Sequence, residues 1–258
     1  MPSRSPSIDL SGRVAVITGA SSGIGAQAAR ALATAGATVA LMARRIERLE
    51  AIVGELKASG ASAAAYGVDV TDAEALRAAA ATIEDELGPA SIVVNNAGIM
   101  LPTAAKDLDG TDARRQIDLN VAALNAVIAA FVDQLVASAA ARGVSDLVNT
   151  ASVAGKIVFP GFASYAASKA YVVHLGNNLR AELGRKNVRV TTLEPGIVET
   201  ELQDHIGNDE VRARLAATRD RIEWLNPADV AEVLTFVVSR PARVNLSEVA
   251  ILPTQQPS

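Results

Sequence analysis

Short apolar segments alternate with longer segments of helical period along most of the chain. The short segments are rich in β-branched residues and predict seven strands, at residues 13–18, 38–43, 64–68, 91–95, 145–150, 188–194 and, more weakly, 248–252. The longer segments place apolar residues three and four positions apart and predict helices at residues 23–35, 45–59, 72–87, 111–142, 162–184 and 227–239. Predicted strands and helices therefore follow one another in regular alternation.

Several of the predicted strands are apolar almost throughout rather than at every second residue. Such strands are buried on both faces, which is typical of a parallel sheet with helices on each side. The predicted fold class is α/β, a single-domain Rossmann fold with a doubly wound, seven-stranded parallel sheet flanked by helices on both faces. Residues 10–258 are expected to form one domain after a disordered leader at residues 1–9. Residues 199–225 are charged, contain no predicted strand and are expected to form a substrate lid.

Composition narrows the classes of function. The 258 residues include 24 Lys and Arg against 28 Asp and Glu, a net charge of −4, so the chain lacks the positive field that nucleic-acid binding needs. It has no cysteine, and His174 and His205 have no ligand residues at metal-binding spacing, so we expect no metal site. Its first residues do not resemble a secretory signal, and its apolar segments carry polar residues. We therefore expect a cytoplasmic protein that binds neither nucleic acid nor membrane.

The first predicted strand leads directly into a glycine-rich turn and then into a helix. The turn carries Gly19, Gly23 and Gly25 in the spacing Gly-x-x-x-Gly-x-Gly. Glycines allow a tight turn and let backbone amides approach a pyrophosphate at the N-terminus of a helix. We predict that the turn binds a dinucleotide through Gly19, Ser21, Ser22, Gly23, Ile24 and Gly25. The alternative is a turn that is tight for structural reasons alone.

The end of the second predicted strand indicates which dinucleotide is bound. A carboxylate at this position binds the ribose 2′-hydroxyl of NAD, whereas the 2′-phosphate of NADP requires cations. Here the strand is followed by Arg44 and Arg45, and no acid is present. Guanidinium groups bind phosphate through charge-assisted, bidentate hydrogen bonds. We therefore predict NADP(H) as the cofactor, the alternative being that both arginines are solvated at the start of a helix.

Tyr165 and Lys169 lie four residues apart near the start of a predicted helix, so their side chains share one face. A free tyrosine has a pKa of ~10 and is a poor acid–base catalyst at neutral pH unless a nearby positive charge lowers it. Lys169 is in position to supply that charge. The spacing alone is unspecific, because a surface tyrosine with a solvated lysine would also satisfy it.

Two more polar residues strengthen the prediction of a catalytic site. Ser152 follows the predicted strand at residues 145–150, at the edge of the sheet where ligands of such folds bind, and its hydroxyl could hold a carbonyl oxygen beside Tyr165. Asn120 lies inside a predicted helix and could anchor a water next to Lys169. The alternatives are a capping hydroxyl for Ser152 and a contact within the helix for Asn120.

With these residues, the chain resembles the short-chain dehydrogenase/reductase family from Arg13 to about Leu252. The motifs that carry the resemblance are Thr18-Gly-x-x-x-Gly-Ile-Gly25, Asn95-Asn96-Ala97-Gly98, the series Asn120, Ser152, Tyr165 and Lys169, and Pro195-Gly196-Ile197-Val198-Glu199-Thr200. Within the family, residues 42–49 and the segments from 199–205 and 251–255 are similar to NADP-dependent bacterial reductases of the clavulanate-dehydrogenase type.

The resemblance implies a role for each matching residue. Tyr165 is the implied general acid or base, Lys169 lowers its pKa and binds the nicotinamide ribose, Ser152 orients the substrate carbonyl and Asn120 holds the water of a proton relay. Asp69 accepts a hydrogen bond from adenine, and Ile197 and Thr200 contact the carboxamide. The remaining implied cofactor-binding residues are Val70, Asn96, Ala97, Gly98, Pro195 and Gly196.

The function that we predict from these residues is NADP(H)-dependent hydride transfer between nicotinamide and a small, largely apolar carbonyl or secondary alcohol. The expected pocket walls are Met100, Ile157, Phe159, Phe162 and Leu202. The alternatives are a non-catalytic protein that senses NADP(H) and an epimerase or dehydratase that uses the same tyrosine. We also expect a homo-oligomer, a dimer or tetramer, because the predicted helices around residues 121–141 and 163–183 carry more apolar and small residues than one sheet face can bury.

Overall fold

The computed structural model describes residues 8–207 and 209–257. Residues 1–7 of the leader expected at 1–9 lie outside this range. The last residues of that leader are described, and there the carboxylate of Asp9 accepts a hydrogen bond of 2.9 Å from the backbone amide of Ser11.

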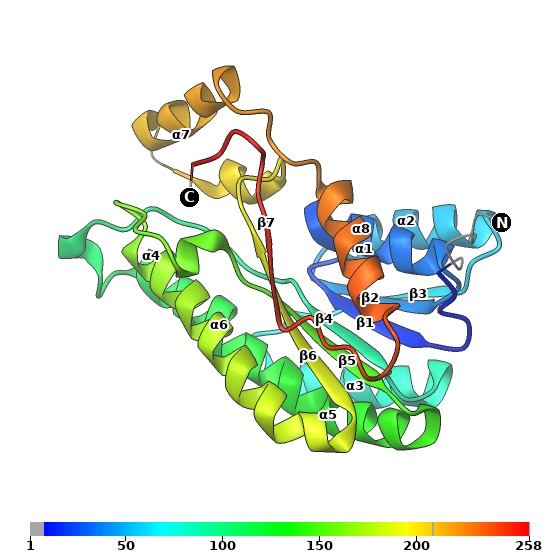
Figure 1. Cartoon of the computed structure of the whole chain (residues 1–258). Coiled ribbons are helices and arrows are strands. Elements are labelled where there is room, and N and C mark those ends of the chain that lie inside the picture. The colour runs from blue at the N-terminus through cyan, green and yellow to red at the C-terminus, as the bar shows by residue number, and fades with distance from the viewer. Residues whose placement is uncertain (1–7, 208, 258) are drawn as a thin grey trace, which may run out of the picture.

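Seven parallel strands form one sheet in the order β3-β2-β1-β4-β5-β6-β7 (Figure 1). The strands are β1 (Val14–Thr18), β2 (Thr38–Ala43), β3 (Ala63–Gly67), β4 (Ile92–Asn95), β5 (Ser145–Thr150), β6 (Val188–Pro195) and β7 (Glu248–Ile251). The order runs outward from β1 in one direction and from β4 in the other, so the chain reverses its direction across the sheet between these two strands. The predicted fold class is confirmed. In open α/β sheets, ligands bind beyond the carboxyl ends of the strands at such a point of reversal.

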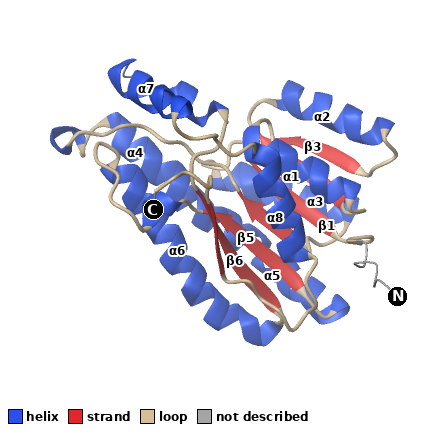
Figure 2. Ribbon diagram, turned by 45° about the horizontal axis from the view of Figure 1, so that its top comes forward, coloured by secondary structure: helices blue, strands red, loops and turns tan. Residues whose placement is uncertain are grey.

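Helices cover both faces of the sheet and make a three-layer molecule (Figures 1 and 2). One face carries α1 (Gly23–Thr34), α2 (Ile46–Ala58) and α8 (Pro227–Val238), and the other carries α3 (Ala73–Leu87), α5 (Leu124–Arg142) and α6 (Ala163–Leu183). Neighbouring residues of one strand point to opposite faces: Ile17 packs in the core beneath α1, and Val16 packs in the core beneath α5. Both faces are therefore buried, as the continuous apolar strands predicted.

The helix predicted at residues 111–142 differs from a regular α-helix. It consists of α4 (Thr111–Ile117), a π-helical turn at Asp118–Ala123 and α5. Asn120 lies in this turn, and its amide bonds to the backbone of Ile99 outside the helix. By length and composition, Thr111–Arg142 is apolar enough to cross a membrane. Its buried residues, including Phe131 and Leu135, pack in the core shared with α3 and the sheet, so one side of this helix belongs to the protein core.

The segment expected to form a lid at residues 199–225 is mostly helical. It contains a 3₁₀ turn at Glu201–His205, the short helix α7 (Asp209–Ala216) and a second 3₁₀ turn at Ala217–Asp220. Its two ends are joined, because Val198 and Leu225 form a parallel bridge. In Figure 2, α7 stands outside the three layers of the sheet and its covering helices.

Candidate active site

The glycine-rich turn between β1 and α1 has a conformation that only glycine fits well. Gly19 and Gly23 have φ angles of +67° and +54°. A Cβ atom on Gly19 would lie 2.9 Å from the Cα of Ala97, and one on Gly25 would lie 2.4 Å from the carbonyl oxygen of Gly19. The turn is therefore a tight cradle that opens at the N-terminus of α1.

The segment after β4 is tied directly to this turn. The side-chain amide of Asn96 donates to the carbonyl oxygens of Thr18 (3.2 Å) and Gly19 (3.4 Å). In return, the hydroxyl of Thr18 accepts hydrogen bonds from the backbone amides of Asn96 and Ala97. Gly98 follows Ala97, and a Cβ atom on Gly98 would lie 3.2 Å from Oδ1 of Asn120. Glycine therefore leaves room between the segment after β4 and the π-helical turn.

A cavity of about 1190 Å³ begins at this turn and extends along the carboxyl ends of the strands. Most of the predicted cofactor-binding residues line it. They are Gly19, Ser21, Ser22, Gly23, Ile24, Arg44, Arg45, Asp69, Val70, Asn96, Ala97, Gly98, Tyr165, Lys169, Pro195, Gly196, Ile197 and Thr200. Gly25 is buried behind the turn instead, where it allows α1 to approach Gly19.

The two arginines after β2 differ in how firmly they are held. The Arg44 side chain is 73% exposed, and its guanidinium lies 4.0 Å from Asp69. Arg45 donates to the hydroxyls of Ser21 (2.9 Å) and Ser22 (3.0 Å). The alternative that both are merely solvated is therefore wrong for Arg45, whose guanidinium lies over the glycine-rich turn.

Arg45 also bonds a carboxylate that the sequence did not point to. Its Nη1 atom donates to Glu201 (2.9 Å), and Arg48 donates to the other oxygen of the same carboxylate (2.6 Å). Hydrogen bonding from Arg48 is the largest cause that lowers the pKa of Glu201 to about 2. The partners are 156 and 153 residues apart in sequence. An acidic residue at the start of the lid was the only available signal, and it does not identify its partners.

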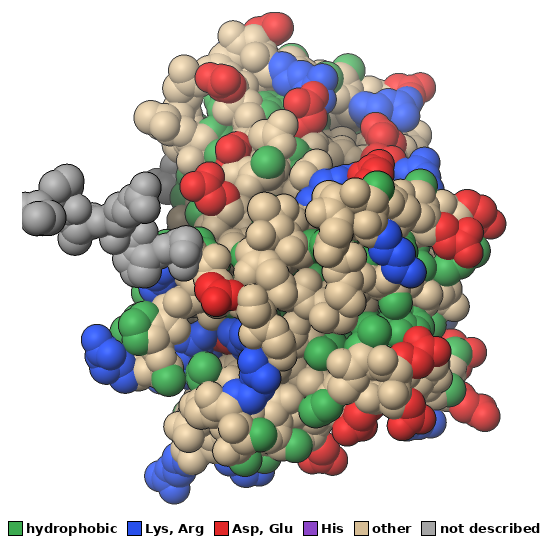
Figure 3. Space-filling model, turned by 90° about the vertical axis from the view of Figure 1, so that its right-hand side faces the viewer, with side chains coloured by type: hydrophobic (Ala, Val, Ile, Leu, Met, Phe, Trp, Pro, Cys, Tyr) green, Lys and Arg blue, Asp and Glu red, His purple; other side chains and the backbone are tan. Residues whose placement is uncertain are grey.

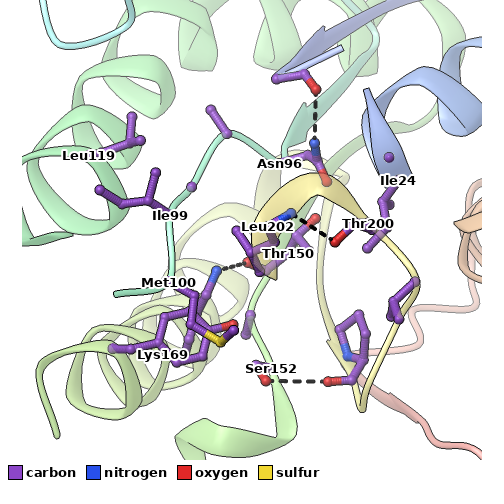
Figure 4. Close-up of a pocket in the computed structure, with 18 of the residues that line it drawn as sticks. Ile24, Asn96, Ile99, Met100, Leu119, Thr150, Ser152, Lys169, Thr200 and Leu202 are labelled. Atoms are coloured by element: carbon purple, nitrogen blue, oxygen red, sulfur yellow. Dashed lines mark hydrogen bonds between the residues drawn. The ribbon is translucent and has the colours of Figure 1, made fainter. Parts of the chain in front are cut away.

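Tyr165 and Lys169 occupy neighbouring turns of α6 and line the same cavity as the glycine-rich turn. Both are buried, with 5% and 7% of their surface exposed, so the alternative of a surface pair is wrong. The Lys169 ammonium lies 5.7 Å from the centroid of the Tyr165 ring and donates to the carbonyl oxygen of Thr150 (2.9 Å; Figure 4).

The expectation that Lys169 lowers the pKa of Tyr165 is wrong for the chain by itself. Burial raises the pKa of Tyr165 to about 12, and a hydrogen bond with Ser152 only partly offsets this. Burial also lowers the pKa of Lys169 to about 8. Removal of the phenol from water is the largest cause of this shift, and the Lys169 ammonium donates to Thr150 instead. The tyrosine therefore stays protonated at neutral pH.

Ser152 lies directly after β5, where its side chain faces the cavity. Its hydroxyl accepts a hydrogen bond from the amide of Ala154 (3.1 Å) and donates to the carbonyl oxygen of Pro195 (3.3 Å; Figure 4). The capping alternative is thus also correct, because the residue begins a 3₁₀ turn at Val153–Gly155. To hold a substrate oxygen, the hydroxyl would turn its one hydrogen from Pro195 toward the cavity, where it is near enough to Tyr165 to lower the pKa of the phenol.

Asn120 connects three parts of the site rather than bonding within its helix. Its amide nitrogen donates to the carbonyl oxygen of Ile99 (2.9 Å) and to the hydroxyl of Ser168 on α6 (3.1 Å). Its amide oxygen accepts from the backbone of Ile99 (2.9 Å). The side chain therefore fixes the segment after β4 to the helix that carries Tyr165 and Lys169.

The C-terminal segment contributes a residue that sequence reasoning missed. The side chain of Gln256 accepts a hydrogen bond from the amide of Ile197 (2.8 Å) and lines the cavity. A Cβ on Gly196 would lie 2.4 Å from the same side-chain oxygen. Gln256 thus holds the segment after β6 in place. It lies outside the matched motifs, so no local pattern indicated it.

Four of the five expected pocket walls line the cavity, namely Met100, Ile157, Phe159 and Leu202. Phe162 does not; it is buried beneath Phe159, and the two rings stack with centroids 4.4 Å apart. The lid adds Leu215 and Ile222 to the apolar wall. Leu202 also packs against the apolar cluster that contains Met100 and Phe162.

A nicotinamide dinucleotide fits this constellation. The glycine cradle, the serine hydroxyls and the arginines match its phosphates, and Lys169 is the donor deeper in the cavity. Beside it, the buried hydroxyl oxygen of Thr150 has no hydrogen-bond partner among the described residues. Within the described part of the chain, no group of three or more His, Cys, Asp or Glu side chains could hold a metal ion, and the side chain of His205 is not described.

Comparisons with known proteins agree with this geometry. The sequence profile of the short chain dehydrogenase family matches residues 13–211. Sulfoacetaldehyde reductase 2 of Chromohalobacter salexigens is 37% identical over 245 residues, which cover 94% of this chain and 95% of that protein. Glycine betaine reductase ATRR of Emericella nidulans is 36% identical over 98% of this chain, which spans only 19% of that longer protein.

Two solved structures are similar over almost the whole chain. Serine dehydrogenase in its closed form with NADP⁺ is 30% identical and superposes with a TM-score of 0.86, covering 95% of this chain and 96% of that one. A 7α-hydroxysteroid dehydrogenase with NADH and 7-oxo glycochenodeoxycholic acid is 28% identical, with a TM-score of 0.86 and 98% of each chain covered. The chain belongs to the short-chain dehydrogenase/reductase family.

Proposed function

We propose that this protein is an NADP(H)-dependent oxidoreductase that transfers a hydride between nicotinamide and a small carbonyl or secondary alcohol, with Tyr165 as general acid or base. The observation that carries the proposal is the shared cavity: the buried Tyr165 and Lys169 lie in the same space as the glycine-rich turn. Membership of the family makes the chain an oxidoreductase that uses a nicotinamide cofactor. The roles of individual residues and the choice of NADP are our inference.

The proposed proton transfer follows from the state of Tyr165. When bound, the nicotinamide supplies or accepts the hydride. A pKa of about 12 keeps the Tyr165 hydroxyl protonated, which is the form that donates to the oxygen of a carbonyl being reduced. Ser152, which bonds the tyrosine, would hold the same oxygen and limit charge build-up on it. For alcohol oxidation the tyrosine must lose its proton, and a charged Lys169 close to it would favour that loss.

Lys169 and Asn120 would complete the site. The ammonium of Lys169, buried and bonded to the Thr150 carbonyl, is placed to bind the nicotinamide ribose hydroxyls. We retain the proposal that Asn120 holds the water of a proton relay. Its amide lies beside the space that Gly98 leaves open, where a Cβ would be 3.2 Å from Asn120 Oδ1 and 3.7 Å from Lys169 Nζ.

The arginines after β2 support NADP(H) over NAD(H). Arg44 is free to reorient, and Arg45 already lies over the two serines of the glycine-rich turn. Guanidinium groups in this place suit a 2′-phosphate. The apolar walls of the inner cavity favour a substrate with an uncharged, apolar substituent.

The chain offers a matched pair of tyrosines for the test. Tyr165→Phe should retain NADPH binding and lower the rate of NADPH oxidation with a panel of ketones and aldehydes by about 10²-fold to 10⁴-fold, because the proton donor is lost. Tyr171→Phe, in which the exposed tyrosine of the same helix is changed, should keep the wild-type rate. Normal turnover by Tyr165→Phe would refute the role of this residue. Saturable NADPH binding without turnover of any carbonyl by the wild type would indicate the sensing alternative, and product without net cofactor use the epimerase or dehydratase.

The oligomeric state and the location in the cell stay predictions. We propose a cytoplasmic dimer or tetramer, and light scattering at micromolar concentration tests its size. On the face in Figure 3, basic and acidic side chains occur beside one another, which supports the proposal that this face does not bind nucleic acid.

A further inference from the structure

The carboxylate of Glu201 bonds Arg45, one of the guanidinium groups that the proposed function assigns to a cofactor phosphate. Its carboxylate joins Arg45 (2.9 Å) and Arg48 (2.6 Å), and Glu201 and Arg45 line the cavity together with Ser21 and Ser22. With its bonds to Glu201 and the two serines, every nitrogen of the Arg45 guanidinium donates a hydrogen bond. We call Arg45, Arg48 and Glu201 the arginine clamp.

The clamp also connects the lid to the glycine-rich turn. Glu201 begins the lid's first 3₁₀ turn, which is capped by the hydroxyl of Thr200. The methyl group of Thr200 would lie 3.1 Å from a Cβ placed on Gly23, so the start of the lid packs directly on the turn. Thr200 is near Ile24 in Figure 4. A substitution at Glu201 therefore alters contacts at the end of the cavity that contains the glycine-rich turn.

From this geometry we propose that Glu201 competes with the cofactor's 2′-phosphate for Arg45 and Arg48, and so limits the preference for NADP(H) over NAD(H). This inference rests on the proposed function, because it assumes that a dinucleotide occupies the cavity. Binding of NADP(H) requires the carboxylate to leave at least one of the two guanidiniums. Binding of NAD(H), whose 2′-hydroxyl carries no charge, leaves the clamp intact.

The exchange is physically accessible because the clamp is at the surface. The side chains of Arg45, Arg48 and Glu201 are 43%, 50% and 38% exposed. Ion pairs of this exposure are weak, since water solvates the separated charges. A phosphate carries more charge and more acceptor oxygens than a carboxylate and can displace it. By linkage, a nucleotide that releases Glu201 also loosens the start of the lid.

The test compares two isosteric variants of neighbouring lid carboxylates. Glu201→Gln removes the competing charge, whereas Glu199→Gln is the control, because Glu199 pairs with Arg219 instead (3.1 Å). Binding of NADPH and NADH is measured separately through the change in nicotinamide fluorescence, with no substrate present. We expect Glu201→Gln to lower the dissociation constant for NADPH about tenfold, the effect of two weak pairs, and to change that for NADH less than about twofold. Glu199→Gln should leave both constants unchanged, and Glu201→Ala should act in the same direction as Glu201→Gln.

Three results would overturn the inference. Weaker NADPH binding by Glu201→Gln would mean that the carboxylate positions the arginines for phosphate. An equal gain for NADPH and NADH would mean that it acts on the lid alone, and unchanged dissociation constants for both nucleotides would mean that it does not compete with either of them. In each of these cases the wild type still binds nucleotide. If the wild type binds neither nucleotide saturably, the proposed function fails as well.

Discussion

Two carboxylates in this molecule each bridge a pair of arginines, and they lie at opposite ends of the sheet. Near the amino ends of the strands, Asp146 bonds Arg13 (2.7 Å) and Arg189 (2.8 Å). At the carboxyl ends, Glu201 bonds Arg45 and Arg48 at similar distances. The difference is burial: the Asp146 side chain is 1% exposed, and that of Glu201 is 38% exposed.

Burial decides what each cluster can do. The guanidiniums around Asp146 also donate to backbone carbonyls, from Arg13 to Ser91 and from Arg189 to Val238 and Arg240. Removing a partner there would leave a charge without water or a counterion, so the cluster is fixed. The arginine clamp keeps water as an alternative partner for all three charges. A carboxylate between two arginines therefore stabilises the fold at Asp146, whereas in the arginine clamp the carboxylate can be exchanged for another anion.

The largest expected effect on stability comes from breaking the buried cluster. Asp146→Ala leaves two buried guanidiniums without their counterion and should lower the free energy of unfolding by about 3–5 kcal/mol. The matched change in the exposed cluster, Glu201→Ala, should cost at most about 1 kcal/mol. Urea unfolding of both variants beside the wild type measures the difference. Equal losses would contradict the distinction between the two clusters.

The contrast also explains what the sequence could predict. The predicted bounds of the seven strands agree with the structure to within one residue, because a strand that is buried on both faces consists of consecutive apolar residues. The sequence also marked Tyr165, Lys169 and the glycine-rich turn as local motifs, and the structure places them along one cavity. Fixed spacing along one helix or turn is enough to place such residues together.

Features that depend on long-range packing were not accessible in this way. Glu201 pairs with arginines more than 150 residues away. The direction of the Tyr165 pKa shift depends on how completely the folded chain excludes water from the phenol. Asn120 in the π-helical turn bonds the backbone of Ile99, which lies 21 residues away in sequence. The local sequence pattern predicts none of these three features.

An intermediate effect is expected when the exposed cluster loses an arginine. Arg45→Ala should weaken NADPH binding by about tenfold or more, because a charge-assisted partner of the 2′-phosphate is lost, and should leave NADH binding nearly unchanged. Arg30→Ala is a suitable control, since Arg30 forms an exposed pair with Glu55 between α1 and α2 and does not line the cavity. Calorimetric titration of each variant with NADPH and with NADH measures the two dissociation constants. Equal weakening of NADPH and NADH by Arg45→Ala would show that the arginine supports the turn rather than the phosphate.

Arg44→Ala tests the more mobile neighbour in the same way. The Arg44 guanidinium lies 4.0 Å from the carboxylate of Asp69, which is a weak ion pair. Arg44 can therefore turn toward a phosphate without breaking a strong hydrogen bond. We expect a several-fold loss of NADPH affinity and no change in the free energy of unfolding beyond about 0.5 kcal/mol. Unchanged NADPH affinity would count decisively against NADP(H) as the preferred cofactor.

The smallest expected effect is a dependence of cofactor preference on pH. The pKa of Glu201 lies at about 2, below its usual value of 4.5, so the carboxylate stays charged down to pH 5. The stability that it contributes is present above pH 4.5 and is lost only as the pH falls toward 2. A phosphate monoester, in contrast, takes up a proton near pH ~6. Between pH 8 and pH 5 the competitor keeps its charge while the ligand loses part of its own.

NADP⁺ affinity should therefore fall a few-fold, by about threefold to tenfold, between pH 8 and pH 5, because the weaker phosphate competes less well with Glu201 for Arg45. Lys169, with a pKa of about 8, gains a proton over the same range and would affect both nucleotides. NAD⁺ is the control that removes this contribution. The measurement is calorimetric titration of both oxidised nucleotides at four pH values. A parallel fall in NAD⁺ affinity would assign the effect to Lys169. A recovery of NADP⁺ affinity toward pH 5 would show that Glu201 is already being protonated. In that case its arginines hold the carboxylate less firmly than their distances indicate.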